Sequence, residues 1–244
     1  MARFILITFI LGHSFYLLVS NSIVTPTVQN VLIDPVNPYK MIDEANDLLK
    51  EGDIVVRLNI DPSSDFIRRF NRIDKAYSHA GVVLFNDGVP FVYHILNGCE
   101  NPGEKLRKDS VVNFFDPKRN LAFGIYRFEL TPIEIANLKA IVSRWYKIGV
   151  KFDYRFDLTT NDKMYCSEMV SKALAAATDN RIKIKTSKPT AIEAGFFSAY
   201  THLPYSYVKQ LEIVAIDNLY ERATCHLVKT FNYKNTGIKS NVVK

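Results

Sequence analysis

Residues 78–94 read SHAGVVLFNDGVPFVYH, and this stretch decides the fold. An apolar, β-branched run follows His79, Asn86-Asp87-Gly88 is a signal for a tight hairpin turn, and a second apolar run leads to His94. The pattern predicts two antiparallel strands joined by that turn. In such a hairpin His79 and His94 fall roughly opposite each other, so we expect their side chains to lie within reach.

The segments on either side of the hairpin predict a single α+β domain. Thr131 and Glu134 form a capping box at the start of the clearest helix, with Pro132 in its first turn. Further strands are predicted at Asp53–Leu58, Pro90–Ile95, Leu121–Phe128 and Ile213–Ile216, and further helices at Met41–Leu49, Ser64–Ile73 and Met164–Ala177. We expect the domain to span residues 23–244, with its core at about residues 40–220.

The composition is that of a globular protein, since 48% of the 244 residues are hydrophobic and 23% are charged. The net charge is +6, with basic residues clustered from Arg181 to Lys188 and again from Lys229 to Lys244. A soluble basic surface explains these clusters, and so does peripheral contact with anionic lipid or cell-wall polymer. No zinc-finger spacing or basic-aromatic motif is found, so no nucleic-acid partner is expected.

Residues 1–22 have the charge and hydropathy order of a secretory signal peptide. Arg3 supplies a positive charge, Phe4–Val19 is almost wholly apolar, and Ser20 and Ser22 are small residues before a cut after residue 22. The alternative is an uncleaved membrane anchor, because the apolar run approaches the length that spans a bilayer. The segment therefore predicts a secreted or periplasmic protein.

The chain has three cysteines, Cys99, Cys166 and Cys225, and an odd number leaves at least one thiol unpaired in an exported protein. If one bridge forms, we expect Cys99 to pair with Cys225 and Cys166 to stay free. No pair has the spacing of a zinc site, so neither a metal nor an organic cofactor is expected.

Cys166 lies where a loop is expected to enter a helix, in the run Tyr165-Cys166-Ser167-Glu168. Unpaired N–H groups and the positive end of the helix dipole favour thiolate over thiol, so we expect a lowered pKa and a nucleophile at neutral pH. The same N–H groups point to where an oxyanion would form. The alternative interpretation is a small buried cysteine that only packs.

A cysteine nucleophile needs a proton carrier, and histidine is the usual one. Of the five histidines, His79 stands at the open end of a strand, and His94 is placed to orient its ring as the third member of a triad does. The residues that we expect to shape the cleft or donate to the oxyanion are Tyr154, Tyr165 and Ser167. Glu168 is expected to cap its own helix or to form a salt link within it.

From Gly52 to about Ala177 the chain resembles the permuted papain-like amidases of the YaeF/YiiX group, relatives of the NlpC-type cell-wall peptidases. The segments that carry the resemblance are Gly52–Val55, Ser78–Val83, Pro90–Tyr93, Gly149–Tyr154 with Phe156, and Tyr165–Val170. In unpermuted papain-like enzymes the cysteine precedes the histidine, whereas here His79 precedes Cys166. The resemblance implies a circularly permuted fold in which an antiparallel sheet packs on a helix that carries the nucleophile.

By this resemblance Cys166 matches the nucleophile and His79 the general base. The third residue of the family is commonly a glutamate, and His94 stands in its place, so the set resembles the Cys-His-His of lecithin:retinol acyltransferase relatives. A neutral ring in place of a carboxylate is expected to stabilise the imidazolium less. The resemblance implies a thioester acyl-enzyme and amide substrates, such as cell-wall peptides or acylated amino acids.

Three functions remain open from the sequence. The first is hydrolysis of an amide or ester, and the second is acyl transfer from lipid, which would favour an amine acceptor over water. The third is a binding domain on a decayed enzyme fold, for which Cys166 would titrate like a free thiol.

Overall fold

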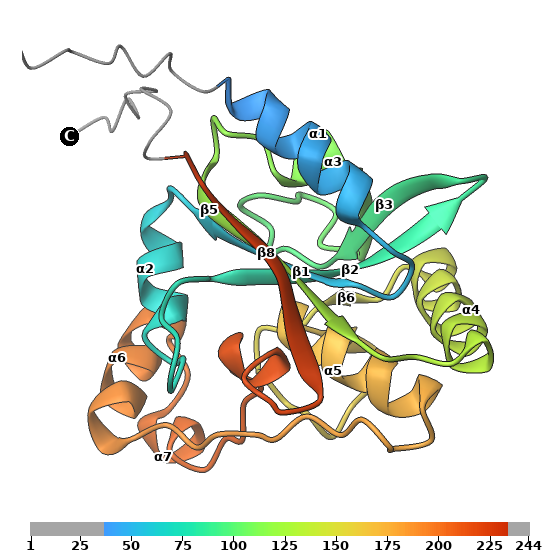
Figure 1. Ribbon diagram of the computed structural model, residues 1–244. Helices are drawn as coiled ribbons and strands as arrows, with labels where there is room; N and C mark the ends of the chain where they lie inside the picture. The colour runs from blue at the N-terminus through green and yellow to red at the C-terminus, as the bar shows by residue number, and fades with distance from the viewer. Residues whose placement is uncertain (1–36, 234–244) are drawn as a thin grey trace, which may run out of the picture. The chain divides into compact units, whose positions relative to one another are not determined.

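The computed structural model describes residues 37–233 (Figure 1). They form a six-stranded antiparallel sheet in the order β4-β3-β2-β1-β5-β8 and a short parallel pair, β6-β7. The signal peptide predicted at residues 1–22 and the basic tail beyond Tyr233 lie outside the described residues. Within residues 37–233, no helix is long and apolar enough to cross a bilayer.

The strands are β1 (Ile54–Asn59), β2 (His79–Asn86), β3 (Val89–His94), β4 (Arg107–Ser110), β5 (Asn120–Phe128), β6 (Lys151–Phe152), β7 (Lys163–Met164) and β8 (Cys225–Asn232). The helices are α1 (Pro38–Leu48), α2 (Pro62–Arg68), α3 (Val111–Phe114), α4 (Pro132–Ile148), α5 (Cys166–Ala177), α6 (Ala191–Thr201) and α7 (Tyr205–Val208), with a 3₁₀ turn, η1, at Asp217–Leu219. The α+β class is therefore confirmed.

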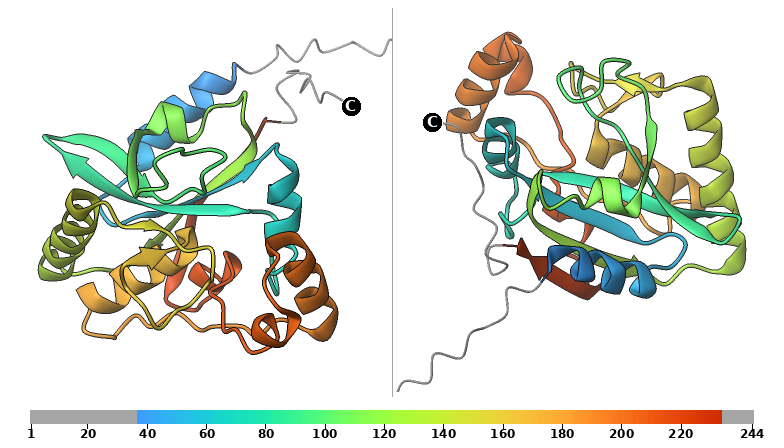
Figure 2. Two further views of the ribbon diagram at one scale, coloured as in Figure 1. Left: turned by 180° about the vertical axis from the view of Figure 1, so that it is seen from behind. Right: turned by 90° about the horizontal axis from the view of Figure 1, so that it is seen from above.

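Helices cover both faces of the sheet (Figures 1 and 2). Along the central strand β1, Ile54 and Val56 are buried with residues of α4 and α5, whereas Val55 is buried with residues of α1 and α3. This alternation is what a strand with two covered faces requires, because successive side chains point to opposite sides. The two faces thus carry two separate apolar layers.

The predicted hairpin is confirmed, but its register differs slightly from the expectation. Val82 pairs with Tyr93 and Asn86 with Val89, so His94 lies beside Gly81 and diagonally from His79. Both imidazoles still occupy one face of the sheet. The capping box at the start of α4 is also confirmed, with Thr131 accepting from the Glu134 N–H and Glu134 accepting from the Thr131 N–H.

A third apolar cluster joins α2, α6 and α7 at the end of the sheet where β1 stops and β2 starts (Figure 1). Phe70 and Phe197 meet edge to face at its centre, with ring centroids 5.1 Å apart. The helix predicted at Ser64–Ile73 is shorter than expected for a tertiary reason. The Asp217 carboxylate accepts the N–H groups of residues 72–74, so these groups are satisfied outside a helix.

Two other expectations are wrong. The strand predicted at Ile213–Ile216 is a single bridge between Ser187 and Ile213, because the next residue bonds to groups at the start of α5 instead. Cys99 and Cys225 are both free thiols. Cys225 opens β8 at one edge of the sheet, whereas Cys99 follows β3 toward the other edge, so the expected bridge does not form.

Candidate active site

Cys166 is the first residue of α5, and the helix places its thiol against β2. Three backbone N–H groups act to lower the pKa of this thiol, namely those of Cys166, Ser167 and Ala80, the residue directly after His79. The side chain is only 7% exposed, and that exposed part faces a cavity that His79 also lines. The structure therefore brings the predicted nucleophile and the predicted base to the same cavity.

The thiol of Cys166 does not have the lowered pKa expected from its place on the helix. Burial raises the pKa, and the three N–H groups near the sulfur only partly offset that effect. The free-energy penalty of removing the thiolate from water is larger here than the stabilisation that the N-terminal end of the helix provides. In the free protein the group is thus a thiol that needs a base at the moment of attack.

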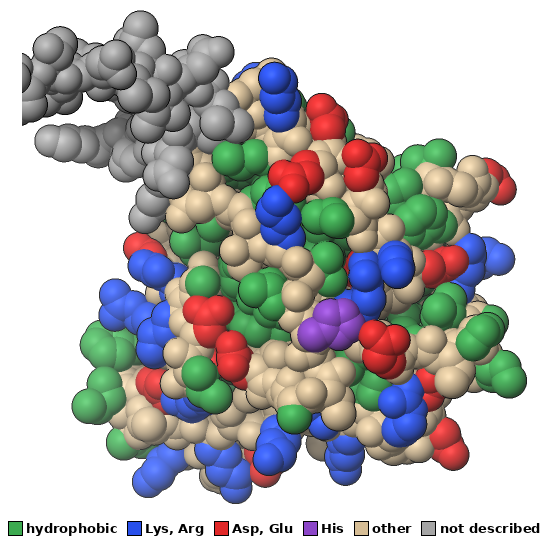
Figure 3. Space-filling view, in the orientation of Figure 1, with side chains coloured by type: hydrophobic (Ala, Val, Ile, Leu, Met, Phe, Trp, Pro, Cys, Tyr) green, Lys and Arg blue, Asp and Glu red, His purple; other side chains and the backbone are tan. Residues whose placement is uncertain are grey.

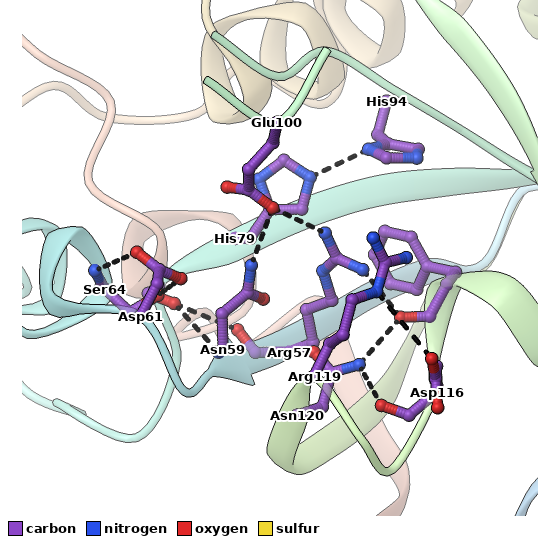
Figure 4. Close-up of polar contacts among 12 residues, drawn as sticks. Arg57, Asn59, Asp61, Ser64, His79, His94, Glu100, Asp116, Arg119 and Asn120 are labelled. Atoms are coloured by element: carbon purple, nitrogen blue, oxygen red, sulfur yellow. Dashed lines mark hydrogen bonds and ion pairs between the residues drawn. The ribbon is translucent and has the colours of Figure 1, made fainter. Parts of the chain in front are cut away.

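His79 opens β2 beside Arg57 of β1, and its ring is turned toward His94 (Figure 4). Nε2 of His79 lies 2.9 Å from Nδ1 of His94, and both rings pack against Phe114 of α3. The predicted pair of imidazoles is therefore present. Because Nε2 of His79 is used in this contact, Nδ1 is the ring nitrogen left to take a proton.

Asp109 on β4 extends the pair into a chain of three side chains. Its Oδ2 lies 3.0 Å from Nε2 of His94, and its Oδ1 accepts two hydrogen bonds from Arg107 at 2.7 and 2.9 Å. The sequence analysis missed Asp109, since β4 is four polar residues long and has no apolar alternation to mark it. The chain therefore has a carboxylate behind His94, so the imidazole pair ends on the kind of group that the family commonly places directly next to the base.

The ionised state of Asp109 determines where the protons of both rings lie. Burial acts to raise the pKa of Asp109, but hydrogen bonds from His94 and Arg107 outweigh it and lower the pKa to about 2. The carboxylate can only accept, so His94 carries its proton on Nε2 and accepts at Nδ1 from Nε2–H of His79. The chain of bonds thus leaves Nδ1 of His79 unprotonated, as a general base requires.

Both rings are neutral over the physiological range. Burial lowers the pKa of His94 to about 4, against the opposing effect of its bond to Asp109. Burial also lowers the pKa of His79 well below its ordinary value, and the positive charge of Arg57 adds to that effect. Arg57 is a second residue that could not be recognised from the sequence, because a single arginine in an apolar strand is usually expected to face solvent, whereas this side chain is buried.

The other candidate residues have different placements. The hydroxyl of Tyr165 accepts the N–H of Val214 at 2.8 Å and lines the cavity, so its own proton can still be donated. Ser167 donates its hydroxyl to the Val214 carbonyl, and Tyr154 donates to Glu104 while it accepts from a loop N–H. All three residues line the cavity. Tyr165 stays a candidate for the oxyanion, whereas the hydroxyls of Ser167 and Tyr154 are bonded to neighbouring segments.

Glu168 has the structural role expected of it. Its carboxylate accepts the N–H of Tyr165 and forms an ion pair with Lys172 at 2.8 Å, one turn along α5. Both contacts lie within the helix and fix its first turn. The first turn of the helix that carries Cys166 is thus stabilised by contacts among residues 165–172.

The cavity beside Cys166 and His79 has a volume of about 390 Å³ and is lined mainly by apolar side chains. They come from α2 and the turn after it, the residue after β3, the loop between β6 and β7, and α6, and they include Phe66, Ile67, Phe70, Ile95, Phe156 and Phe197. Polar side chains also line it, among them Asn59, which donates to Glu100 at 3.3 Å (Figure 4). The cavity therefore combines a mainly apolar wall with a few polar groups.

Gly81 leaves the space that His94 needs, which gives a testable expectation. A Cβ at this position would lie 2.5 Å from Val92 Cγ1, 3.0 Å from the Tyr93 carbonyl and 3.3 Å from His94 Cβ. We expect Gly81→Ala to lower the free energy of unfolding by about 1–3 kcal/mol and to reduce turnover by displacing His94. Urea denaturation and a turnover assay measure the two effects.

Gly195→Ala is the matched control for that substitution. A Cβ at Gly195 of α6 meets nothing within 4 Å, so alanine should be neutral or stabilising by up to about 1 kcal/mol. Unchanged stability and unchanged turnover in Gly81→Ala would contradict the packing argument.

A thiol at the start of a helix that packs on an antiparallel sheet, with a base on the neighbouring strand, defines the papain-like class of thiol hydrolases. Because His79 precedes Cys166, the order is the permuted one. Residues 48–223 match the family described as permuted papain-like amidase enzyme, YaeF/YiiX, C92 family. The chain belongs to this family, and it is a thiol-dependent hydrolase of the amidase type.

A solved structure has the same fold. The chain resembles the crystal structure of YiiX from Escherichia coli O157:H7, described as a metalloprotein, with a TM-score of 0.60 and 17% sequence identity over 75% of this chain and 97% of that one. No curated protein matches the chain. Between residues 37 and 233, no group of three or more His, Cys, Asp or Glu side chains is arranged to hold a metal ion.

Proposed function

We propose that the protein hydrolyses amides of long-chain acyl groups through a thioester on Cys166. His79 takes the thiol proton on Nδ1 while the sulfur bonds to the acyl carbon, and it returns that proton to the nitrogen as the C–N bond breaks. Water then attacks the thioester carbon while His79 accepts a proton from the water. The C–S bond breaks, the carboxylic acid leaves, and His79 returns the proton to the sulfur, which regenerates the Cys166 thiol. Backbone N–H groups at the start of α5 are the expected donors to the oxyanion.

The apolar cavity is the observation that carries this proposal. It opens beside the sulfur, and aromatic and aliphatic side chains form most of its wall. A peptide would need hydrogen-bond partners along its backbone, which such a wall does not offer. An acyl chain needs none, so the cavity fits an acyl group better than a peptide.

Two polar side chains that line the cavity support an amide rather than an ester. Oδ1 of Asn59 is buried and has no hydrogen-bond partner among the described residues. The Glu100 carboxylate lies beside it, and burial raises the pKa of Glu100 despite the nearby Arg57. Both groups can accept hydrogen bonds, so they suit a leaving group with N–H donors.

A series of acyl amides tests the proposal. Each carbon added to a fluorogenic N-acyl amide should raise kcat/KM by up to about fourfold until the chain fills the cavity, because burying one CH₂ is worth about 0.8 kcal/mol. The measurement is the release of the fluorescent amine as the acyl chain is lengthened. A flat dependence on chain length, or a preference for peptides of similar size, would contradict the acyl assignment.

Acyl transfer is the second candidate, and the His79–His94 contact favours it because this pair resembles the set in lecithin:retinol acyltransferase relatives. The same assay decides between the two when a primary amine is added. Formation of a new amide in preference to the free acid would identify a transferase.

Because residues 1–22 resemble a signal peptide, we further propose that the reaction takes place outside the cytoplasm.

A further inference from the structure

Helix α6 presents an apolar row to solvent as well as an apolar face to the protein. Ile192, Phe196 and Tyr200 recur every fourth residue, and they are 74%, 58% and 52% exposed. The opposite face of the helix is buried through Ala194 and Phe197. Residues at this spacing lie along one side of a helix, so the outward row is continuous.

This outward row borders the cavity beside Cys166. Tyr200 belongs to the row and also lines the cavity, where its ring stacks on Phe66 of α2 with centroids 4.1 Å apart. Phe197, one position after Phe196, points inward to the same cavity. One short helix thus carries the exposed row on one side and part of the cavity wall on the other.

Exposed basic side chains occur in the segments that adjoin α6 in the chain and just after α2, which packs against α6 through Phe66 and Tyr200. They are Lys185, Lys188 and Lys209 in the segments that flank α6 and α7, and Arg69 and Lys75 directly after α2. One of them, Lys188, is paired with Glu212 at 3.8 Å. The acidic Glu193 of α6 is neutralised by an ion pair with Arg72 at 2.8 Å. Figure 3 shows Lys and Arg side chains along the lower edge of this view, over the α6–α7 region, with hydrophobic side chains beside them.

We propose that this face, defined as Ile192, Phe196 and Tyr200 with these basic side chains, docks onto anionic lipid bilayers. An exposed apolar row flanked by lysines and arginines is the arrangement of helices that lie in the interface of a membrane. The inference rests on the proposed function, because an acyl chain would pass from the bilayer into a cavity on the other side of the same helix. Docking shortens the path of that chain through water.

Site-specific fluorescence tests the docking. The chain has a single tryptophan, Trp145, so a Trp145→Phe background allows one reporter at Phe196→Trp and another at Ile133→Trp, an exposed position on α4. With vesicles that contain brominated phosphatidylglycerol, the reporter at position 196 should be quenched and the one at 133 should not. Equal quenching at both positions, or none at 196, would overturn the proposal.

A second measurement links docking to turnover. Ile192→Ser with Phe196→Ser should lower hydrolysis of an acyl amide held in phosphatidylglycerol vesicles by about tenfold, and it should leave a water-soluble short-chain amide unaffected. Ile133→Ser with Ile148→Ser, both on the exposed side of α4, is the matched control and should change neither rate. Equal rates of the α6 double variant and this control on vesicles would also overturn the proposal.

The two proposals fail in different ways. If the unaltered protein hydrolyses neither amide, the proposed function is wrong, while quenching at position 196 still supports docking. If both amides are hydrolysed and position 196 is not quenched, the docking is wrong and the hydrolase assignment stands.

Discussion

Cys166→Ala is expected to reduce turnover of any amide substrate by at least about 10⁵-fold, since removal of a nucleophile in a comparable hydrolase removes nearly all catalysis. In the proposed mechanism the sulfur is the protein group that bonds to the acyl carbon. The measurement is steady-state amide hydrolysis with purified protein. Folding is checked by thermal unfolding, because Cys166 is buried and its replacement by a smaller residue leaves a small void.

The other cysteines provide the control. Cys99 is exposed and Cys225 is partly buried, and both are free. Cys225 does not line the cavity, so Cys225→Ser should keep its turnover, whereas Cys99 lines the cavity and is also replaced by serine only to leave Cys166 as the single thiol for labelling. In that double variant iodoacetamide reports on Cys166 alone. Because burial raises the pKa of Cys166, the labelling rate should climb at alkaline pH and stay low at mildly acidic pH. Normal turnover in Cys166→Ala would remove the thioester mechanism.

Asp109→Asn is expected to lower kcat by about 10²–10⁴-fold with little change in KM, the upper value being that of the aspartate in a serine protease triad. The amide can turn its N–H toward Nε2 of His94, which places the His94 proton on Nδ1. His79 must then accept at Nε2 and carry its own proton on Nδ1, the nitrogen that has to remove the thiol proton. Asp109 does not line the cavity, so substrate binding should stay near normal.

Arg107→Gln is the matched control, since it removes the partner of Asp109 Oδ1 and keeps the carboxylate bonded to His94. We expect less than about a tenfold loss of kcat, because a partly exposed ion pair contributes little free energy. A folded Asp109→Asn protein that keeps kcat within a few-fold of the original would show that Asp109 only supports the fold.

The pH dependence follows from the same groups. The pKa of His79 lies well below its ordinary 6.5, so the base stays unprotonated, and kcat/KM limited by His79 should hold as pH falls through 6.5. The rate should drop only at more acidic pH, where His79 gains a proton and can no longer accept one. A pH–rate profile of hydrolysis that bends near 6.5 would contradict this environment for His79.

Local sequence signals predicted the parts of the fold that depend on local chemistry. The Asn86-Asp87-Gly88 turn and the capping box of Thr131 with Glu134 each act over a few residues, and the structure contains both. The same kind of signal was available for α6, where Thr190 and Glu193 form a capping box that the sequence analysis did not use. Helix α6 could therefore have been predicted.

Other parts of the site could not be predicted, because they depend on distant contacts. Asp109 lies in a strand of four residues that exists only because β3 offers an edge to pair with. Arg57 is buried only because α3 supplies a carbonyl at 2.7 Å and a ring beneath its guanidinium. No short-range pattern in the sequence marks either interaction.

The position of β8 has a consequence for biosynthesis. Strand β8 pairs with β5 along its whole length, and Phe231 stacks on Phe123 with centroids 4.5 Å apart. The ribosome makes β8 long after β5, so the partly made chain leaves Phe123 uncovered and one side of β5 without its neighbour. Pairing of segments so far apart in sequence is slow. Completion of the sheet must therefore wait until β8 has been translated, near the end of the described residues.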